Sequence, residues 1–114
     1  MAANYQAFAK LYIAPAEADA ESSFGGGLIA LLRGVQETGS LNRAAKDMHM
    51  AYSKAWKLMN SAEEQFGVQL IERDGARGSS LTEEGARIVA AFDAVSRDVS
   101  AYAKQRLNEE LGKH

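Results

Sequence analysis

The sequence predicts a mainly α-helical fold with a small β-hairpin. Apolar residues recur three or four positions apart in several stretches, and a short polar turn separates two of these stretches. A glycine-rich turn between two short segments then precedes one more long stretch of helical spacing. The 114 residues are enough for one domain with a modest core.

Residues 1–24 are expected to form an N-terminal strand and loop. Residues 7–14, AFAKLYIA, gather aromatic and aliphatic side chains and predict a short strand. Pro15 ends that strand because proline has no N–H to donate to a ladder. The polar, glycine-rich stretch AEADAESSFGGG that follows predicts a loop.

The next part of the chain predicts helices. Residues 28–38, LIALLRGVQET, form the first, which Gly39 ends because glycine adopts left-handed backbone at little cost. Ser40 is the expected N-cap of a short second helix, from Leu41 to about Met48. A third helix is predicted from near Tyr52 to Phe66 and ends at Gly67. Its apolar stripe consists of Ala55, Leu58, Met59, Ala62 and Phe66.

The turn between the second and third helices has its own pattern. Ala44 and Ala45 are small enough to let the third helix cross the second closely. Met48 and Met50 are interpreted as apolar plugs beneath the turn. His49 is interpreted as a turn residue and not a metal ligand, because the chain has two histidines and no cysteine.

Residues 68–82, VQLIERDGARGSSLT, predict the hairpin. Val68 and Leu70 alternate with polar neighbours, DGARGSS has the composition of a turn, and residues 80–82 form a brief return strand. Thr82 is the expected N-cap of a last helix, which reaches about Leu111 and has two glutamates in its first turn.

This order of elements predicts a winged helix-turn-helix. Two helices joined by a turn of three or four residues make the helix-turn-helix motif, and the hairpin directly after them supplies a wing. The expected organisation is an N-terminal strand and loop (1–24), a winged helix-turn-helix DNA-binding domain (25–82) and a long C-terminal dimerisation helix (83–114).

Charge is distributed unevenly along a chain whose net charge is only −2. Between Arg33 and Lys57 lie five basic and two acidic residues, so the remainder is acidic. A local basic surface on the helix pair is the electrostatic footprint of a nucleic-acid-binding region. In helix-turn-helix proteins, the N-terminal residues of the second helix of the pair enter the major groove.

We therefore predict that double-stranded DNA is bound by side chains from the helix pair and the wing. Those at the start of the third helix avoid its apolar stripe and are expected to read or position bases, whereas Trp56 is expected at the rim of the core. The arginines are expected to hold phosphates. The predicted DNA-binding residues are Ser40, Asn42, Arg43, Tyr52, Ser53, Lys54, Lys57, Arg73 and Arg77.

The last helix carries a heptad pattern that predicts a homodimer. Its apolar residues repeat at intervals of four, three, four and three, and Leu107 and Leu111 extend the track. The predicted dimerisation residues are Ile88, Phe92, Val95, Val99 and Tyr102. The alternative interpretation is that this seam packs on the first helix of the same domain.

Two quoted stretches resemble a known family. TGSLNRAAKDMHMAYSKAWKLM, followed by LIERDGARGSSLTEEG, resembles the N-terminal winged-helix domain of the ModE family of molybdate-responsive transcriptional regulators. The spacing SLNRAA…FGVQLIER also resembles, more distantly, the LysR-type DNA-binding domain. The resemblance covers roughly residues 25–90 and implies a bacterial-type regulator that binds double-stranded DNA sequence-specifically. Its matching residues are Thr38-Gly39-Ser40, Ala45-Lys46-Asp47, Tyr52, Ala55-Trp56, Glu72-Arg73 and Leu81-Thr82 with Gly85.

Two positions depart from the ModE pattern. His49 stands where glycine is usual, and histidine tolerates left-handed backbone better than most residues. Ala51 stands where serine is usual, which removes an N-cap hydroxyl worth about 0.5–2 kcal/mol. Full-length members carry oxyanion-binding domains after the long helix, and this sequence stops at His114. The resemblance thus implies a stand-alone member that lacks an oxyanion-binding domain and a small-molecule effector site.

Other function classes find little support in the residues. No nucleophile–base set or ligand cluster stands out, so we expect no enzymatic activity, cofactor or metal. No stretch approaches the roughly 18 apolar residues that span a bilayer, and the N-terminus lacks a secretory signal, which predicts a cytoplasmic protein without a membrane partner. The alternative function is a winged-helix module that binds a protein partner in place of DNA, which the net negative charge favours.

Overall fold

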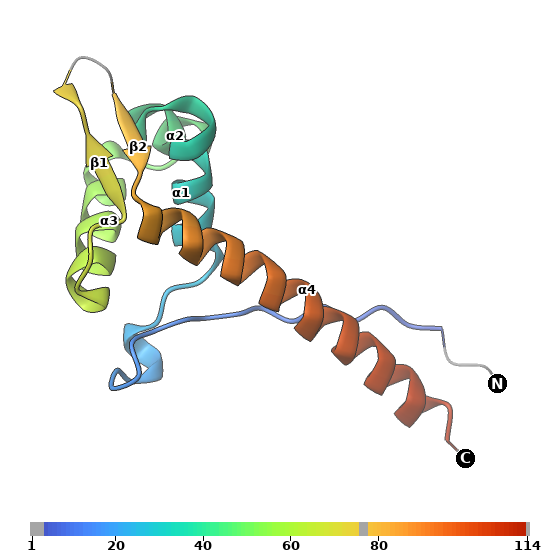
Figure 1. Cartoon of the computed structure of the whole chain (residues 1–114). Helices are drawn as coiled ribbons and strands as arrows, with labels where there is room; N and C mark the ends of the chain where they lie inside the picture. The colour runs from blue at the N-terminus through green and yellow to red at the C-terminus, as the bar shows by residue number, and fades with distance from the viewer. Residues whose placement is uncertain (1–3, 76–77, 114) are drawn as a thin grey trace.

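The computed structural model describes residues 4–75 and 78–113. Its helices and strands surround one core, and a long helix extends away from them (Figure 1). In chain order the elements are a short 3-10 helix (Ala20–Ser22), α1 (Gly26–Thr38), α2 (Leu41–Asp47), α3 (Tyr52–Phe66), β1 (Ile71–Arg73), β2 (Ser79–Leu81) and α4 (Glu83–Leu111). The prediction of a mainly α-helical winged helix-turn-helix with a long C-terminal helix is confirmed.

The apolar face of α1 forms the centre of the core. It packs against α2, α3, β2 and α4, so one helix contacts most of the other elements. Its most deeply buried side chains are at most 1% exposed: Leu28, Leu31, Leu32 and Val35. Burying each side chain of this size contributes about 1.5–3 kcal/mol.

The caps at the ends of α1 and α3 and at the start of α2 are those that the sequence predicted. Gly39 and Gly67 adopt left-handed backbone at the ends of α1 and α3, with φ of 74° and 70°. The Ser40 side chain accepts a hydrogen bond from the Arg43 amide and caps α2. Met48 lies just beyond α2, and both it and Met50 pack against the core, as the sequence predicted.

The close approach at Ala44 involves a different helix from the one predicted. A Cβ on Gly34 would lie 2.6 Å from the Ala44 Cβ, so the small side chains let α2 approach α1. The sequence predicted this role of Ala44 and Ala45 toward the third helix, whereas the close contact of Ala44 is with α1, because helix spacing alone does not say which neighbour a small residue meets.

Hydrogen bonds connect the hairpin to the rest of the domain. β1 and β2 pair antiparallel, with Ile71 opposite Leu81. The Ser79 amide donates to the Gly39 carbonyl at 2.7 Å, which fastens β2 to the turn between α1 and α2. Strand β1 begins at Ile71, not at Val68, which is exposed, and β2 begins one residue before the predicted return strand.

Thr82 connects the hairpin to α4 and is buried. Its side-chain oxygen donates to the Gln69 carbonyl and accepts from the Gly85 amide, while its own amide donates to the Leu70 carbonyl. The predicted N-cap is therefore confirmed, and it also fixes the entrance to β1.

The predicted strand at residues 7–14 was wrong. This segment is extended but forms only one isolated bridge, between Ile13 and Phe24. It runs beside α4 in the opposite direction (Figure 1), where the Tyr5 amide bonds to Asn108 and the Ala9 amide to Ser100. Its partners on that edge are helix side chains, so no ladder forms although the composition suits a strand.

The loop predicted at residues 16–27 contains two helical pieces. A short 3-10 helix is capped by Asp19, and α1 starts at Gly26, two residues before the predicted start. Phe24 belongs to the core and stacks at 5.5 Å on Phe66 of α3. The proposed boundary after residue 24 stays a prediction.

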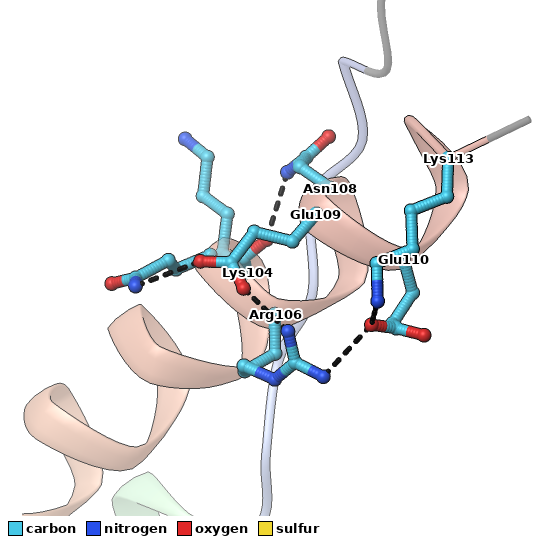
Figure 2. Close-up of polar contacts among 7 residues, drawn as sticks. Lys104, Arg106, Asn108, Glu109, Glu110 and Lys113 are labelled. Carbon is cyan, nitrogen blue, oxygen red and sulfur yellow. Dashed lines mark hydrogen bonds and ion pairs between the residues drawn. The ribbon is translucent and has the colours of Figure 1, made fainter.

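The C-terminal end of α4 carries a cluster of ion pairs (Figure 2). The hydrogen bond from Gln105, followed by that from Arg106, lowers the pKa of Glu109, and Lys113 and then Arg106 lower the pKa of Glu110. The same carboxylates raise the pKa of Arg106. Since the pKa values of the two carboxyls are lowered in the folded chain, their contribution is present at neutral pH and is lost as pH falls through those values. The contribution is small because these side chains are solvated.

None of the helices within the described ranges combines the length and the hydropathy that a membrane span requires.

Gly85 gives a test of how closely α4 approaches the hairpin. A Cβ at this position would lie 2.2 Å from the Leu70 carbonyl oxygen. Gly85→Ala is therefore expected to lower the free energy of unfolding by about 1–3 kcal/mol, measured by urea denaturation. Gly27→Ala, at a position where a Cβ meets no atom within 4 Å, is the control and should lose nothing. Equal stability of both variants would contradict this packing.

Candidate nucleic-acid interface

The start of α3 is exposed. Tyr52, Ser53 and Lys54 occupy its first turn and are open to solvent. Ala51 makes no side-chain cap, and His49 in the preceding turn takes left-handed backbone with φ of 56°. Both departures from the ModE pattern therefore have the expected local form, and the helix begins where the sequence placed it.

The two sides of α3 differ in polarity. Ala55, Met59 and Ala62 are fully buried against the core. At about 100° per residue, Ser53 and Lys57 lie one turn apart on the opposite side, and Lys54 lies on a flank between the two. In the described part of the chain Lys54 and Lys57 form no ion pair, so this outer face of α3 presents two unpaired ammonium groups.

The start of α2 adds a second polar surface. Asn42 and Arg43 are exposed and, with Thr38, Ser40 and Lys46, line a shallow depression. The Arg43 Nε lies 3.7 Å from an Asp47 oxygen, in a solvent-exposed pair that is worth little. The Ser40 hydroxyl oxygen accepts the capping hydrogen bond from the Arg43 amide. The main role of this side chain is therefore to hold the turn before α2.

The wing approaches α3 through Arg73. The Arg73 guanidinium carbon lies 3.3 Å from the centre of the Trp56 ring, and Tyr52 meets the same ring edge-on at 6.1 Å. The prediction of Trp56 at the rim of the core is confirmed, because it is half-buried and packs against the core. Arg77 lies outside the described residues.

Glu63 is a structural residue that the sequence interpretation missed. Its carboxylate accepts hydrogen bonds from the amides of Leu70 and Ile71 at 2.7 and 3.2 Å, which ties β1 to the C-terminal half of α3. The sequence analysis did not single out Glu63, because its partners are backbone amides of another element, which no spacing within α3 indicates.

The local positive charge is smaller than the sequence indicated. Arg33, which belongs to the basic stretch, points to α4 and pairs with Asp93 at 2.5 Å. The remaining basic residues of the stretch, Arg43, Lys46, Lys54 and Lys57, are exposed on α2 and α3. The basic surface is thus confined to the helix pair and leaves α1 out.

Comparison with known protein families agrees with this geometry. Residues 27–86, more than half of the chain, match the model of the bacterial regulatory helix-turn-helix proteins of the lysR family. The chain belongs to this LysR family. The match covers α1 to the first turn of α4, that is, the helix pair and the wing.

The curated relatives of this LysR-family chain include ModE proteins, which the sequence resembled, and a helix-turn-helix transcriptional regulator. The molybdenum transport protein ModE of Azotobacter vinelandii is 36% identical over 87 residues, which are 73% of this chain and 32% of that protein. The regulator CrgA of Neisseria meningitidis serogroup B is 36% identical over 73 residues, 64% of this chain and 24% of that protein. The chain spans about a third or less of the length of these relatives.

Solved structures of LysR-type DNA-binding domains share the fold. The DNA-binding domain of CbnR in complex with DNA has a TM-score of 0.59 and 24% identity, and covers 75% of this chain and 95% of its own. The BenM DNA-binding domain, also in a DNA complex, has a TM-score of 0.58 and 23% identity, and covers 77% and 97%. These likenesses establish the winged-helix fold.

Glu63 allows a test of how this LysR-type wing is anchored. Glu63→Ala leaves the Leu70 and Ile71 amides without their acceptor and is expected to lower the free energy of unfolding by about 1–3 kcal/mol. Faster hydrogen exchange at those two amides, followed by NMR, checks the mechanism. Glu64→Ala, on the exposed side of the same turn, should stay within about 0.5 kcal/mol of the parent. If the two alanine variants are equally stable, the anchor does not exist.

Proposed function

We propose that this chain binds double-stranded DNA as a homodimer and regulates transcription. The observation that carries the proposal is the outer face of α3, which presents Ser53, Lys54 and Lys57 to solvent while its other side is buried in the core. In a helix-turn-helix protein this is the surface that enters the major groove. Membership of the LysR family of regulators supports the same function.

Each predicted side chain has a chemical role in this proposal. Lysine and serine donate to guanine acceptors or to phosphates, and Tyr52 contacts phosphate or a thymine methyl group. Asn42 and Arg43, at the start of α2, contact phosphates at the edge of the DNA groove that α3 enters. Ser40 caps the helix that carries them. Arg73 and Arg77 reach a neighbouring phosphate or the minor groove from the wing.

A homodimer through α4 completes the proposal. The predicted seam divides in two: Ile88 and Phe92 pack against the core of the same chain, whereas Val95, Val99 and Tyr102 are 44%, 40% and 63% exposed. In the N-terminal segment, which runs beside α4, Phe8 is 86% exposed and Tyr12 is 61% exposed. A second copy would cover the exposed part of the α4 seam and set two recognition helices about 34 Å apart, or a multiple of that, on one side of the duplex.

The location of the protein follows from its proposed ligand. A regulator of this bacterial family that binds chromosomal DNA works in the cytoplasm, and binding, not catalysis, is its task.

Substituting the two lysines of α3 tests the DNA contact. Lys57→Ala and Lys54→Ala are expected to weaken binding to a selected duplex and to lower the slope of log Kd against log salt by about 0.9 each, because one phosphate contact is lost per lysine. Fluorescence anisotropy over a salt series measures both quantities. Lys104→Ala, an exposed lysine near the far end of α4, is the matched control and should change neither. If the parent protein fails to bind any duplex at micromolar concentration and low salt, the proposal of a protein partner replaces DNA binding.

The dimer is tested by placing a charge in the exposed part of the α4 seam. Val99→Glu is expected to convert the dimer to a monomer, because a carboxylate would have to be desolvated in an apolar interface. Sedimentation velocity measures the mass. Ala101→Glu adds the same charge to an exposed position on another side of α4 and should leave the dimer intact. An unchanged mass for Val99→Glu, or a monomeric parent, would contradict the seam.

A further inference from the structure

An aromatic cluster joins the start of α3 to the wing. The central carbon of the Arg73 guanidinium lies over the Trp56 ring, 3.3 Å from the ring centre. At this distance the planar group stacks on the face of the ring. Tyr52, one turn earlier on α3, presents its ring edge to Trp56 at an interplanar angle of 88°. Two of these three residues, Tyr52 and Arg73, are also predicted DNA contacts.

We propose that Trp56 is a positioning residue for DNA binding, which holds the Arg73 guanidinium in the orientation that contacts a backbone phosphate. The inference rests on the DNA-binding function proposed above. Trp56 acts indirectly, through Arg73. The recognition helix and the wing then form one DNA-binding surface and do not bind independently.

The geometry of β1 explains why Arg73 reaches Trp56. Adjacent strand residues point to opposite faces, so Arg73 shares a face with Ile71, which is buried, and Glu72 points away. Glu63 binds the amides of Leu70 and Ile71, and Trp56 lies seven residues earlier on α3, about 10 Å nearer to its start. The strand therefore runs along α3 toward the end that is proposed to enter the groove (Figure 1).

The stacking leaves the hydrogen-bonding edge of the guanidinium available. Its N–H donors lie in the plane of the group, so a ring on one face does not block them. A free arginine side chain loses about 2 kcal/mol of rotamer entropy when it is fixed, and a residue already held on a ring loses less on binding phosphate. The Tyr52 contact in turn restrains the plane of the indole.

Lysine would not replace arginine in this role. A stacked guanidinium offers a flat face to the indole and several donors to a phosphate, whereas an ammonium group is a point charge on a flexible stem. Arg73→Lys thus keeps the charge and removes the oriented geometry. This distinguishes positioning from simple charge.

The first part of the experiment examines the stack without DNA. Trp56 is the only tryptophan of the chain, so fluorescence excited at the red edge of the indole absorption, where the four tyrosines do not absorb, reports on it alone. Arg73→Gln should shift the Trp56 emission maximum and increase its quenching by acrylamide, because one face of the indole becomes open to solvent. Identical emission and quenching in the parent and in Arg73→Gln would overturn the inference.

The second part is a double-mutant cycle on DNA affinity across a salt series. Trp56→Leu should weaken binding by about two- to fivefold, the size of a solvent-exposed cation–π contact, and lower the salt slope toward that of Arg73→Gln. In the Arg73→Gln background, Trp56→Leu should have little further effect. Lys54→Gln is the control partner, and its effect should multiply with that of Trp56→Leu, since the two side chains are not in contact.

The remaining outcomes decide between the explanations. Independent effects of Trp56→Leu and Arg73→Gln, or an unchanged salt slope in Trp56→Leu, would show that Trp56 only packs and would overturn the inference. If circular dichroism shows that Trp56→Leu does not fold, Trp56→Phe and Arg73→Lys replace it. Trp56→Phe should retain most of the DNA affinity, and Arg73→Lys should lose it. The reverse order of affinities would overturn the proposal. A parent that binds no duplex refutes DNA binding itself, and fluorescence then still reports whether the stack exists.

Discussion

The burial of the apolar face of α1 is the constraint on which the rest of the structure depends. Leu28, Leu31, Leu32 and Val35 are almost completely removed from solvent, and α2, α3, α4 and β2 all pack around them. The approach of α2 is possible because Gly34 faces Ala44, where an additional methyl group would collide. The angle between α2 and α3, and with it the exposure of the outer face of α3, is therefore fixed from beneath by α1 and not by the short turn alone.

The wing depends on polar contacts as well as on burial. Each of its strands has three residues, of which Ile71 is buried and Leu81 is partly buried against the core. Its position is set by the Glu63 carboxylate, by the Gly39 carbonyl and by Thr82, each of which bonds to the backbone near a strand end. Hydrogen bonds are directional, so a few of them orient a small hairpin that apolar packing could not hold in one place. The orientation matters because the hairpin carries Arg73.

The sequence predicted those features that depend on local spacing or local backbone chemistry. The apolar stripes of α1 and α3, the glycine at each left-handed cap and the Thr82 cap all follow from residues within one or two turns of each other. The N-terminal strand was wrong for the opposite reason. Residues 7–14 have the composition of a strand, but a strand exists only if a partner edge is present, and here the neighbour is α4.

In the candidate site, too, the features set by local spacing were predicted and the contacts between distant residues were not. The exposure of Tyr52, Ser53, Lys54 and Lys57 followed from the position of the buried stripe, because a helix has only one side left when the other is apolar. Pairings between distant residues did not follow. Arg33 is neutralised by Asp93, sixty positions later, and Arg73 meets Trp56 across the gap between wing and helix. The sequence around each of these residues does not identify its partner, because long-range contacts are set by how the elements pack.

The net negative charge of the chain is compatible with a basic recognition surface because the charges are segregated. Arg33 is paired with Asp93 on α4, and at the last turns of α4 the carboxylates of Glu109 and Glu110 are paired with Arg106 and Lys113, so that end of the helix is not acidic. Residues 41–57, on α2 and the start of α3, carry four basic residues and one acidic residue. This local excess of positive charge attracts a polyanion to one face of the molecule although the whole chain is mildly acidic. A uniformly basic protein would have stronger non-specific affinity but no preferred face, so the mild overall acidity favours orientation at the expense of strength.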